Sequence, residues 1–225
     1  MALGLLVLAL GGGLVWLALR LCAAAPVRAA TRAGYFDAVL PGLEGARRGR
    51  APTGFPRLAG RMGGLELDLQ VVPDSLTFRK LPALWLLVTA LEPLPLSQRI
   101  QLMTRPRGVE PFSNIARLPV QTALPPGFPA DAMLKSEAPL TADEAALLRL
   151  HLDLFDDPRV KELVLAPEGL RIVWLADEAE RGRYLLFREA ELGQEQLAPH
   201  ALSPLVARLR AIRADILREG MRKCA

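Results

Sequence analysis

Three aspartates close together in the chain have the spacing best suited to chemistry. Asp156 and Asp157 follow Asp153 by three and four residues, and residues at those intervals share one face of a helix. Their carboxylates would offer oxygens to Mg²⁺ or Ca²⁺ if further ligands, such as Glu162, came from elsewhere. The simpler interpretation is a solvated helix end that Pro158 terminates. We therefore predict no metal-binding residue and no cofactor.

The other residue types with catalytic chemistry lack the neighbours that a reaction needs. Of the two histidines, we expect His151, which lies among leucines, to be a partly buried structural residue and His200 to be solvated. The sequence has no glycine-rich phosphate loop, no dinucleotide fingerprint and no serine in a nucleophile elbow. Cys22 and Cys224 form neither a disulfide framework nor a metal site, which suits a reducing compartment. We expect no catalytic residue and lean towards a protein that is not an enzyme.

The N-terminal segment predicts where the rest of the chain is located. Residues 1–19 carry no charged side chain and would span about 28 Å as a helix, which matches the hydrocarbon core of a bilayer. A cleaved secretory signal would need a basic start and a shorter apolar stretch, although Ala23–Ala25 would suit a peptidase. We therefore predict that residues 1–21 form a single transmembrane helix in the lipid bilayer. Gly11–Gly13 would let two such helices form a homodimer, but small residues are common in any spanning helix.

Charge predicts which side of the membrane the remaining chain occupies. Arg20, Arg28 and Arg32 follow the apolar segment, and basic flanks stay on the cytoplasmic side. Residues 1–120 hold fourteen Lys and Arg against seven Asp and Glu, whereas residues 121–225 hold fourteen against seventeen. We expect a single-pass protein of the cell inner membrane with a cytoplasmic domain, for which contact with anionic lipid is physically reasonable. Nucleic-acid binding is not expected, because a dense basic stripe and stacking aromatics are missing.

Hydrophobic patterning predicts one α+β domain of antiparallel hairpins or meanders with a mid-chain helix and a C-terminal helix. Residues 22–56 are expected to hold a juxtamembrane helix and a linker rich in Gly, Pro and Arg, so that the globular domain covers residues 57–225. Leu65–Val71 alternates apolar and polar residues after a Gly63–Gly64 turn, which predicts a strand with one buried face. Further strands are expected at Leu81–Leu91, Arg99–Thr104, Leu118–Thr122, Glu162–Leu165, Leu170–Leu175 and Tyr184–Arg188.

The two helices are predicted from their caps and apolar faces. Thr141 and Glu144 form a capping box at the start of a helix that would extend to about Asp156. Ser203–Pro204 would begin the terminal helix, with an N-cap followed by a first-turn proline. Its apolar face consists of Leu205, Leu209, Ile212 and Ile216, and Gly220 would close it.

The segment from Arg105 to Pro129 is the first candidate for a binding surface. Its six prolines remove backbone donors and resist regular structure. Loops of this length are uncommon without a function. A structural wrap over a sheet edge explains the segment equally well.

The stretches Pro73–Pro82, Glu110–Ser113 and Asp156–Glu162 resemble segments of hypothetical single-span membrane proteins from GC-rich proteobacteria. The resemblance covers most of the domain and implies a bacterial source. That group of uncharacterised proteins has no assigned activity, so the resemblance implies no site residues.

Two classes of function remain. The first is a membrane-anchored, non-catalytic adaptor or interaction protein, which the apolar leader, the proline-rich loop and the missing catalytic set favour. The second is a membrane-tethered enzyme or small-ligand sensor with an unidentified pocket. A deep cavity with converging polar groups would favour the second class, and an apolar patch on the loop side would favour the first.

Overall fold

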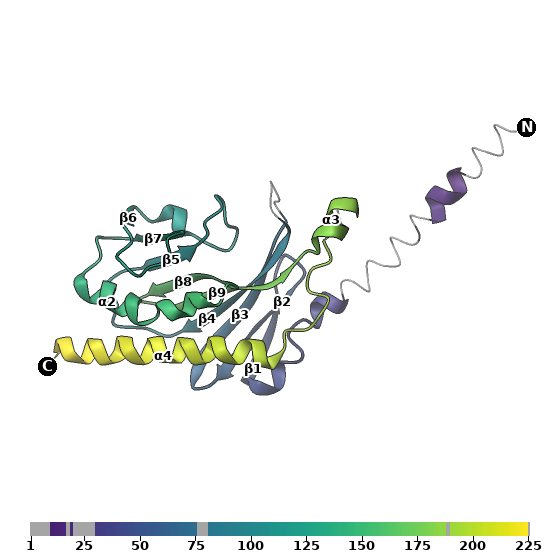
Figure 1. Ribbon diagram of the computed structural model, residues 1–225. Coiled ribbons are helices and arrows are strands. Elements are labelled where there is room, and N and C mark those ends of the chain that lie inside the picture. The colour runs from purple at the N-terminus through teal and green to yellow at the C-terminus, as the bar shows by residue number, and fades with distance from the viewer. Residues whose placement is uncertain (1–9, 17–18, 20–29, 76–80, 188–189, 225) are drawn as a thin grey trace, which may run out of the picture.

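The computed structural model describes residues 10–16, 19, 30–75, 81–187 and 190–224. They form an α+β fold with a large antiparallel sheet, a mid-chain helix and a C-terminal helix, as the sequence predicted (Figure 1). The strands are β1 (Glu44–Arg50), β2 (Pro56–Met62), β3 (Leu65–Asp74), β4 (Ala83–Leu91), β5 (Ile100–Thr104), β6 (Val120–Thr122), β7 (Ala132–Ser136), β8 (Val160–Ala166) and β9 (Gly169–Glu178). The longer helices are α2 (Ala142–Leu150), α3 (Arg181–Phe187) and α4 (Pro199–Cys224).

Within the described residues, nine strands form one antiparallel sheet in the order β1-β2-β3-β4-β9-β8-β5-β7-β6. The β2–β3 hairpin turns at Gly63–Gly64, and both glycines have the positive φ that such a tight turn requires. The β8–β9 hairpin inserts between β4 and β5, although it follows both of them in sequence. This insertion places β8 beside β5, with Glu162 paired to Met103 close to the start of the proline-rich loop.

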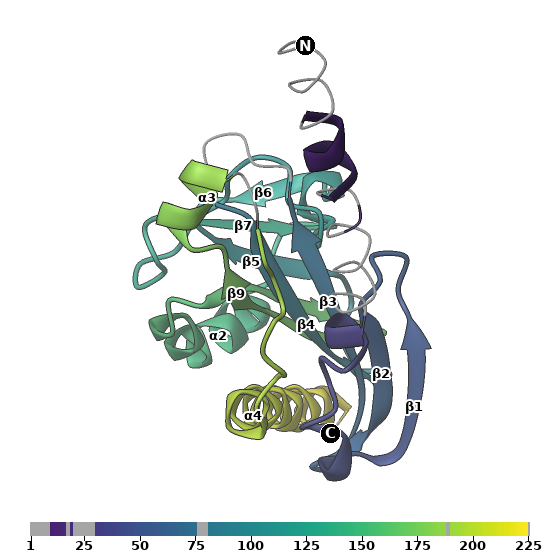
Figure 2. The same ribbon diagram turned by 90° about the vertical axis from the view of Figure 1, so that its right-hand side faces the viewer.

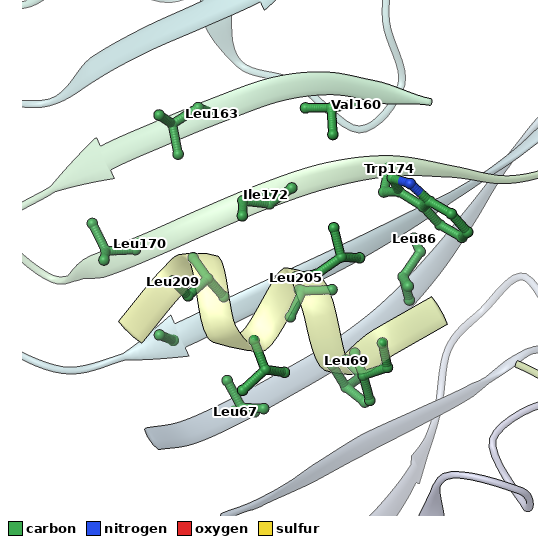
Figure 3. Packing of buried hydrophobic residues seen from close by; sticks show 14 of the residues in the cluster. Leu67, Leu69, Leu86, Val160, Leu163, Leu170, Ile172, Trp174, Leu205 and Leu209 are labelled. Atoms are coloured by element: carbon green, nitrogen blue, oxygen red, sulfur yellow. The ribbon is translucent and has the colours of Figure 1, made fainter. Parts of the chain in front are cut away.

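Both α2 and α4 pack on the same face of the sheet, where they enclose the main core (Figure 2). The predicted apolar face of the C-terminal helix is confirmed, because its four members are all buried. Figure 3 shows Leu205 and Leu209 of α4 facing apolar side chains that come from several strands of the sheet. Burying one leucine contributes roughly 1.5–3 kcal/mol. The α4–sheet contact is therefore a major source of stability.

A smaller apolar cluster lies on the opposite face of the sheet. Phe112 and Ile115 of the proline-rich loop belong to it, and the Phe112 ring lies 4.9 Å from the ring of Trp85. The strands contribute Leu87, Met103 and Val173. The first part of the loop, residues 105–119, is therefore packed onto the sheet.

Three predicted elements differ from the structure. The mid-chain helix, expected to extend to about Asp156, ends at Leu150, and a short 3₁₀-helix follows over Leu152–Asp156. The prediction of a strand at Tyr184–Arg188 is wrong, because residues Arg181–Phe187 form helix α3. Periodicity cannot separate a helix from a strand in so short an apolar run. The terminal helix begins at Pro199 instead of Ser203–Pro204 and continues past Gly220 to Cys224. Pro204 removes one backbone bond near the helix start, and the buried face after it keeps the helix continuous.

The region expected to be a linker contains a strand. Within residues 41–56, Glu44–Arg50 form β1, whose side chains are all exposed. β1 pairs with β2 at a point where Gly60 permits close approach, since a Cβ there would lie 3.1 Å from the Glu44 carbonyl oxygen. Before β1, Tyr35 and Phe36 are buried in the main core.

The predicted transmembrane segment lies mostly outside the described residues. Residues 10–16 of that segment are helical, and their apolar side chains are exposed. Among the helices of the described residues, none has both the length and the apolar character needed to cross a membrane.

Candidate functional site

A β-bulge in β8 brings two ionisable residues next to the proline-rich loop. Val160 pairs with Trp174 and Glu162 pairs with Val173, so Lys161 is the extra residue of the bulge. Neighbouring residues of a regular strand point to opposite faces, but a bulge redirects side chains. As a result, both Lys161 and Glu162 bond to residues of the loop.

Lys161 is buried against the start of the loop. Its Nζ donates to the carbonyl of Arg105 at 2.5 Å and lies 3.1 Å from Oε1 of Glu110. Burial lowers the pKa of the Lys161 ammonium below its usual range, and the neighbouring Glu110 carboxylate opposes that shift. Glu110 also accepts a hydrogen bond from the backbone N–H of Arg107 at 3.0 Å. The pair thus ties the first turn of the loop to β8.

Glu162 ties down the next part of the loop. Its Oε1 accepts a hydrogen bond from Oγ of Ser113 at 2.5 Å, and Ser113 Oγ accepts one from the backbone N–H of Ile115 at 3.1 Å. Burial raises the pKa of Glu162 to about 7. The hydrogen bond from Ser113 and the charge of Arg171 both lower this pKa, but their effect is smaller than that of burial. This carboxyl therefore titrates near neutral pH.

Arg105 fixes the point where the loop leaves β5. Its φ of 49° lies in the left-handed region that non-glycine residues rarely adopt. Its guanidinium donates to the carbonyls of Pro158 and Val160, each at 2.8 Å, and its N–H donates to the carbonyl of Asp131 at 2.8 Å. These bonds hold the strained residue in place. We call Arg105, Glu110, Ser113, Lys161 and Glu162 the loop clamp.

The clamped loop has an inner and an outer side. Phe112, Ile115 and Leu118 are buried against the sheet. Val109, by contrast, is 84% exposed. The other outward-facing residues include Arg107, Pro111, Asn114 and Arg117. The clamp therefore presents a mixed apolar and basic surface in one defined conformation.

A hollow of about 170 Å³ lies beside the clamp. Its lining includes Trp85, Arg107, Lys161 and Leu175. The Nε1 atom of Trp85 is buried and has no hydrogen-bond partner among the described residues. A buried donor without an acceptor is unusual in folded proteins.

The sheet face next to the loop carries charged and polar side chains. Arg57 of β2 forms two hydrogen bonds with the Asp68 carboxylate of β3, at 2.6 and 3.0 Å. Asp68 pairs across strands with Thr89, whose Oγ1 accepts a hydrogen bond from Arg171 Nε at 3.0 Å. This part of the sheet face is polar, unlike the core face covered by α4.

The structure does not bring the three aspartates together as a cation site. Asp153 forms a bidentate ion pair with Arg208 of α4, Asp156 is exposed, and Asp157 accepts a hydrogen bond from Trp174 Nε1 at 2.9 Å. Among the described residues, no group of three or more His, Cys, Asp or Glu side chains is placed to hold a metal ion. The carboxylates of Asp153 and Asp157 instead attach this segment to α4 and β9.

The histidines lie where the sequence predicted. His151 is buried at the end of α2, and His200 is exposed in the first turn of α4. Nε2 of His151 lies 3.2 Å from Oδ2 of Asp215, but the approach lacks hydrogen-bond geometry. Burial lowers the pKa of His151, and the Asp215 charge opposes the shift. His151 is therefore a buried imidazole whose neutral form is favoured by burial. Cys22 lies outside the described residues.

The sequence did not identify the clamp: Glu162 was considered only as a possible cation ligand, and its carboxylate instead accepts a hydrogen bond from Ser113. Lys161 and Glu162 stand next to each other inside the otherwise apolar run Val160–Leu165, and two adjacent residues of a regular strand point to opposite faces. No comparable signal identifies Glu110 or Ser113, because their partners lie about fifty residues away in sequence. No known protein family, curated protein or solved structure matches the chain.

Proposed function

We propose that the protein is a non-catalytic adaptor, tethered to a membrane by residues 1–21, that binds a partner protein with the outer side of its clamped loop. The observation that carries this proposal is the loop clamp, in which three buried ionisable residues, Glu110, Lys161 and Glu162, hold one loop. A buried ion pair contributes little net stability, because desolvation offsets its attraction. Its effect here is to specify the conformation of residues 105–119.

A loop held in one conformation favours binding. Ordering a flexible loop on association weakens affinity, and a loop that is already ordered avoids that loss. The outer side combines an exposed Val109 with Arg107 and Arg117. Arginine is enriched among residues that dominate binding energy at protein interfaces.

The apolar leader supports the membrane tether. Leu10, Leu14, Val15 and Trp16 are helical and at least 60% exposed, so they do not pack into the core of the domain. An apolar helix is stable in lipid, where its backbone groups are satisfied internally. The basic residues that follow the leader favour a cytoplasmic domain.

Partner capture by proximity labelling in native membranes tests the adaptor proposal. The variant Val109→Asp with Arg117→Glu changes the outer side of the loop and leaves the clamp intact. Leu150→Asp is the matched control, because Leu150 is an exposed leucine on α2, away from the loop. We expect the loop variant to lose a specific partner that the wild-type chain and the control both capture. The same set of proteins captured by all three chains would overturn the proposal.

The hollow beside the clamp favours a second candidate, a membrane-tethered sensor or enzyme for a small molecule. The unpartnered Nε1 of Trp85 would donate to an acceptor on such a ligand. However, the volume of about 170 Å³ is below the roughly 300–1,000 Å³ of typical ligand pockets. A metabolite that raises the unfolding temperature of the wild-type chain, but not of Trp85→Phe, would favour this candidate.

A further inference from the structure

A second hollow, larger than the one beside the loop clamp, lies at the start of α4. Its volume of about 510 Å³ falls within the roughly 300–1,000 Å³ of typical ligand pockets. Its walls come from the segment before β1, the end of β9, residues 190–198 and the first turn of α4. Residues 190–198 lead to the start of α4 (Figure 1), and Trp174 of β9 lies on the side of the sheet that α4 covers (Figure 3).

Two hydrogen bonds hold residues 190–198 against the rest of the wall. The backbone N–H of Gly193 donates to Oδ2 of Asp177 at 2.8 Å, and the backbone N–H of Leu197 donates to the carbonyl of Tyr35 at 2.9 Å. Leu197 is also buried in the main core. The fold itself thus fixes the shape of the hollow, as in most small-molecule sites.

Acidic side chains dominate the charge of the hollow. Its lining holds five carboxylates, from Asp177, Glu178, Glu180, Glu191 and Glu195. Glu191 forms an ion pair with Arg183 of α3 at 2.8 Å. Glu178, Glu180 and Glu195 are exposed to solvent. The surplus of negative charge favours a cation as the ligand.

The positive groups of the wall are fewer. The Arg159 guanidinium lies 4.1 Å from the centre of the Trp174 ring and donates to the carbonyls of Leu175 and Ala176, at 3.0 and 3.1 Å. His200, in the first turn of α4, also lines the hollow, and a helix N-terminus carries about half a positive charge. Together with the Arg183 that pairs with Glu191, these groups leave the carboxylates in excess.

Tyr35 contributes a buried hydroxyl group to the wall. The residue is 3% exposed and lines the hollow, and its hydroxyl has no hydrogen-bond partner among the described residues. Burial, and to a smaller extent the Asp177 charge, raises the pKa of this hydroxyl, so it remains protonated and neutral near pH 7. A buried polar group without a partner is unusual. An ammonium group in the hollow would donate to its oxygen.

We propose that this hollow binds a linear polyamine, whose ammonium groups lie among the carboxylates and beside the hydroxyl of Tyr35. A single metal ion does not fit, because no group of three or more His, Cys, Asp or Glu side chains in the described part of the chain is placed to hold one. Carboxylates that do not converge on one point instead match several positive charges separated by methylene groups. The methylene groups pack against apolar side chains of the lining, such as Leu197 and Ala201. The proposal goes beyond the adaptor role and depends on neither the membrane tether nor the loop clamp.

Isothermal titration calorimetry with spermidine tests the site in the full chain, held in a non-ionic detergent. Glu180→Gln with Glu195→Gln removes two exposed carboxylates of the lining, and Tyr35→Phe removes only the hydroxyl. Asp131→Asn with Asp156→Asn is the matched control, because both aspartates are exposed, lie outside the lining and change the net charge by the same amount. A second titration adds Mg²⁺ at the same concentration as spermidine.

We expect the wild-type chain and the control to bind spermidine equally, and the glutamine variant and Tyr35→Phe each to bind it about fivefold more weakly. Mg²⁺ should not displace the polyamine. Equal affinity in all four chains, or no binding by the wild-type chain, would overturn the proposal. Displacement by Mg²⁺ would also overturn it, because the carboxylates would then act only as a diffuse acidic surface. Unchanged binding by Tyr35→Phe would exclude a ligand beside the hydroxyl.

Discussion

The Lys161 ammonium and the Glu110 carboxylate lie 3.1 Å apart beneath the proline-rich loop, with their side chains 4% and 3% exposed. Two ions buried this deeply lose most of their hydration, and their attraction only partly offsets that loss. Each ion is therefore tolerated because the other is present. The loop conformation depends on both.

Replacing one member of this pair should destabilise the protein more than replacing both. Lys161→Met leaves the Glu110 carboxylate buried without its cation, which costs about 3–5 kcal/mol of unfolding free energy. The double variant Lys161→Met with Glu110→Leu should recover more than half of that loss. Urea denaturation of the full chain in detergent measures both effects. Equal losses in the single and double variants would mean that the two charges do not interact.

The raised pKa of Glu162 predicts a loss of stability with increasing pH. Its carboxyl has a pKa of about 7 in the folded chain against an ordinary value of 4.5, so the folded state binds the proton more tightly. The contribution is complete below pH 4.5 and disappears as the pH rises through 7.

The variant Glu162→Gln isolates this contribution, because its amide oxygen still accepts from Ser113 and does not titrate. Between pH 4.5 and pH 7, the unfolding free energy of the wild-type chain should fall by about 2–4 kcal/mol relative to the variant. Denaturation of both chains across that range measures the difference. Parallel pH profiles would show that folding does not raise the pKa of Glu162.

Sequence patterns predicted the helices and strands whose formation depends on residues close together in the chain. The alternation in Leu65–Val71 and the Gly63–Gly64 turn fix the β2–β3 hairpin, and the buried face of α4 follows from helical spacing. β1 escaped prediction because none of its side chains is buried, so it carries no hydrophobic pattern. It forms by pairing with β2, where Gly60 lets the two backbones approach.

The candidate site was harder to predict than the fold because it is assembled from distant segments. The β8–β9 hairpin must insert beside β5 before Lys161 and Glu162 can contact the loop. The residues near Glu110 carry no sequence pattern that predicts their contact with β8. The aspartates at 153, 156 and 157 had a clear local pattern, yet tertiary contacts with Arg208 and Trp174 engage two of them.

Gly169, at the start of β9, should tolerate no side chain. Its φ is +147°, and a Cβ there would lie 2.1 Å from the carbonyl oxygen of Ala90 in β4. Gly169→Ala should therefore cost roughly 3 kcal/mol or more, from backbone strain together with overpacking. Gly64→Ala is the control, because Gly64 also has a positive φ of +80° but has open space around it. It should lose about 1 kcal/mol from strain alone. Similar losses in denaturation would exclude the clash with β4.

Two hydroxyl residues that the sequence marks as helix caps should respond differently to alanine. Thr141 caps α2 by accepting from the backbone N–H of Glu144 at 3.2 Å, within a complete capping box. Ser203 lies inside α4, where its hydroxyl donates to the carbonyl of Pro199 at 2.9 Å. Thr141→Ala should lower the unfolding free energy by about 1 kcal/mol.

Ser203→Ala should change the unfolding free energy by less than about 0.5 kcal/mol, because alanine is the better helix former at an interior position. Denaturation of the two variants beside the wild-type chain measures both effects. The result also tests where α4 begins. If Ser203→Ala lost as much stability as Thr141→Ala, the hydroxyl of Ser203 would be a true N-cap, and the terminal helix would begin at Pro204 as its sequence pattern suggests.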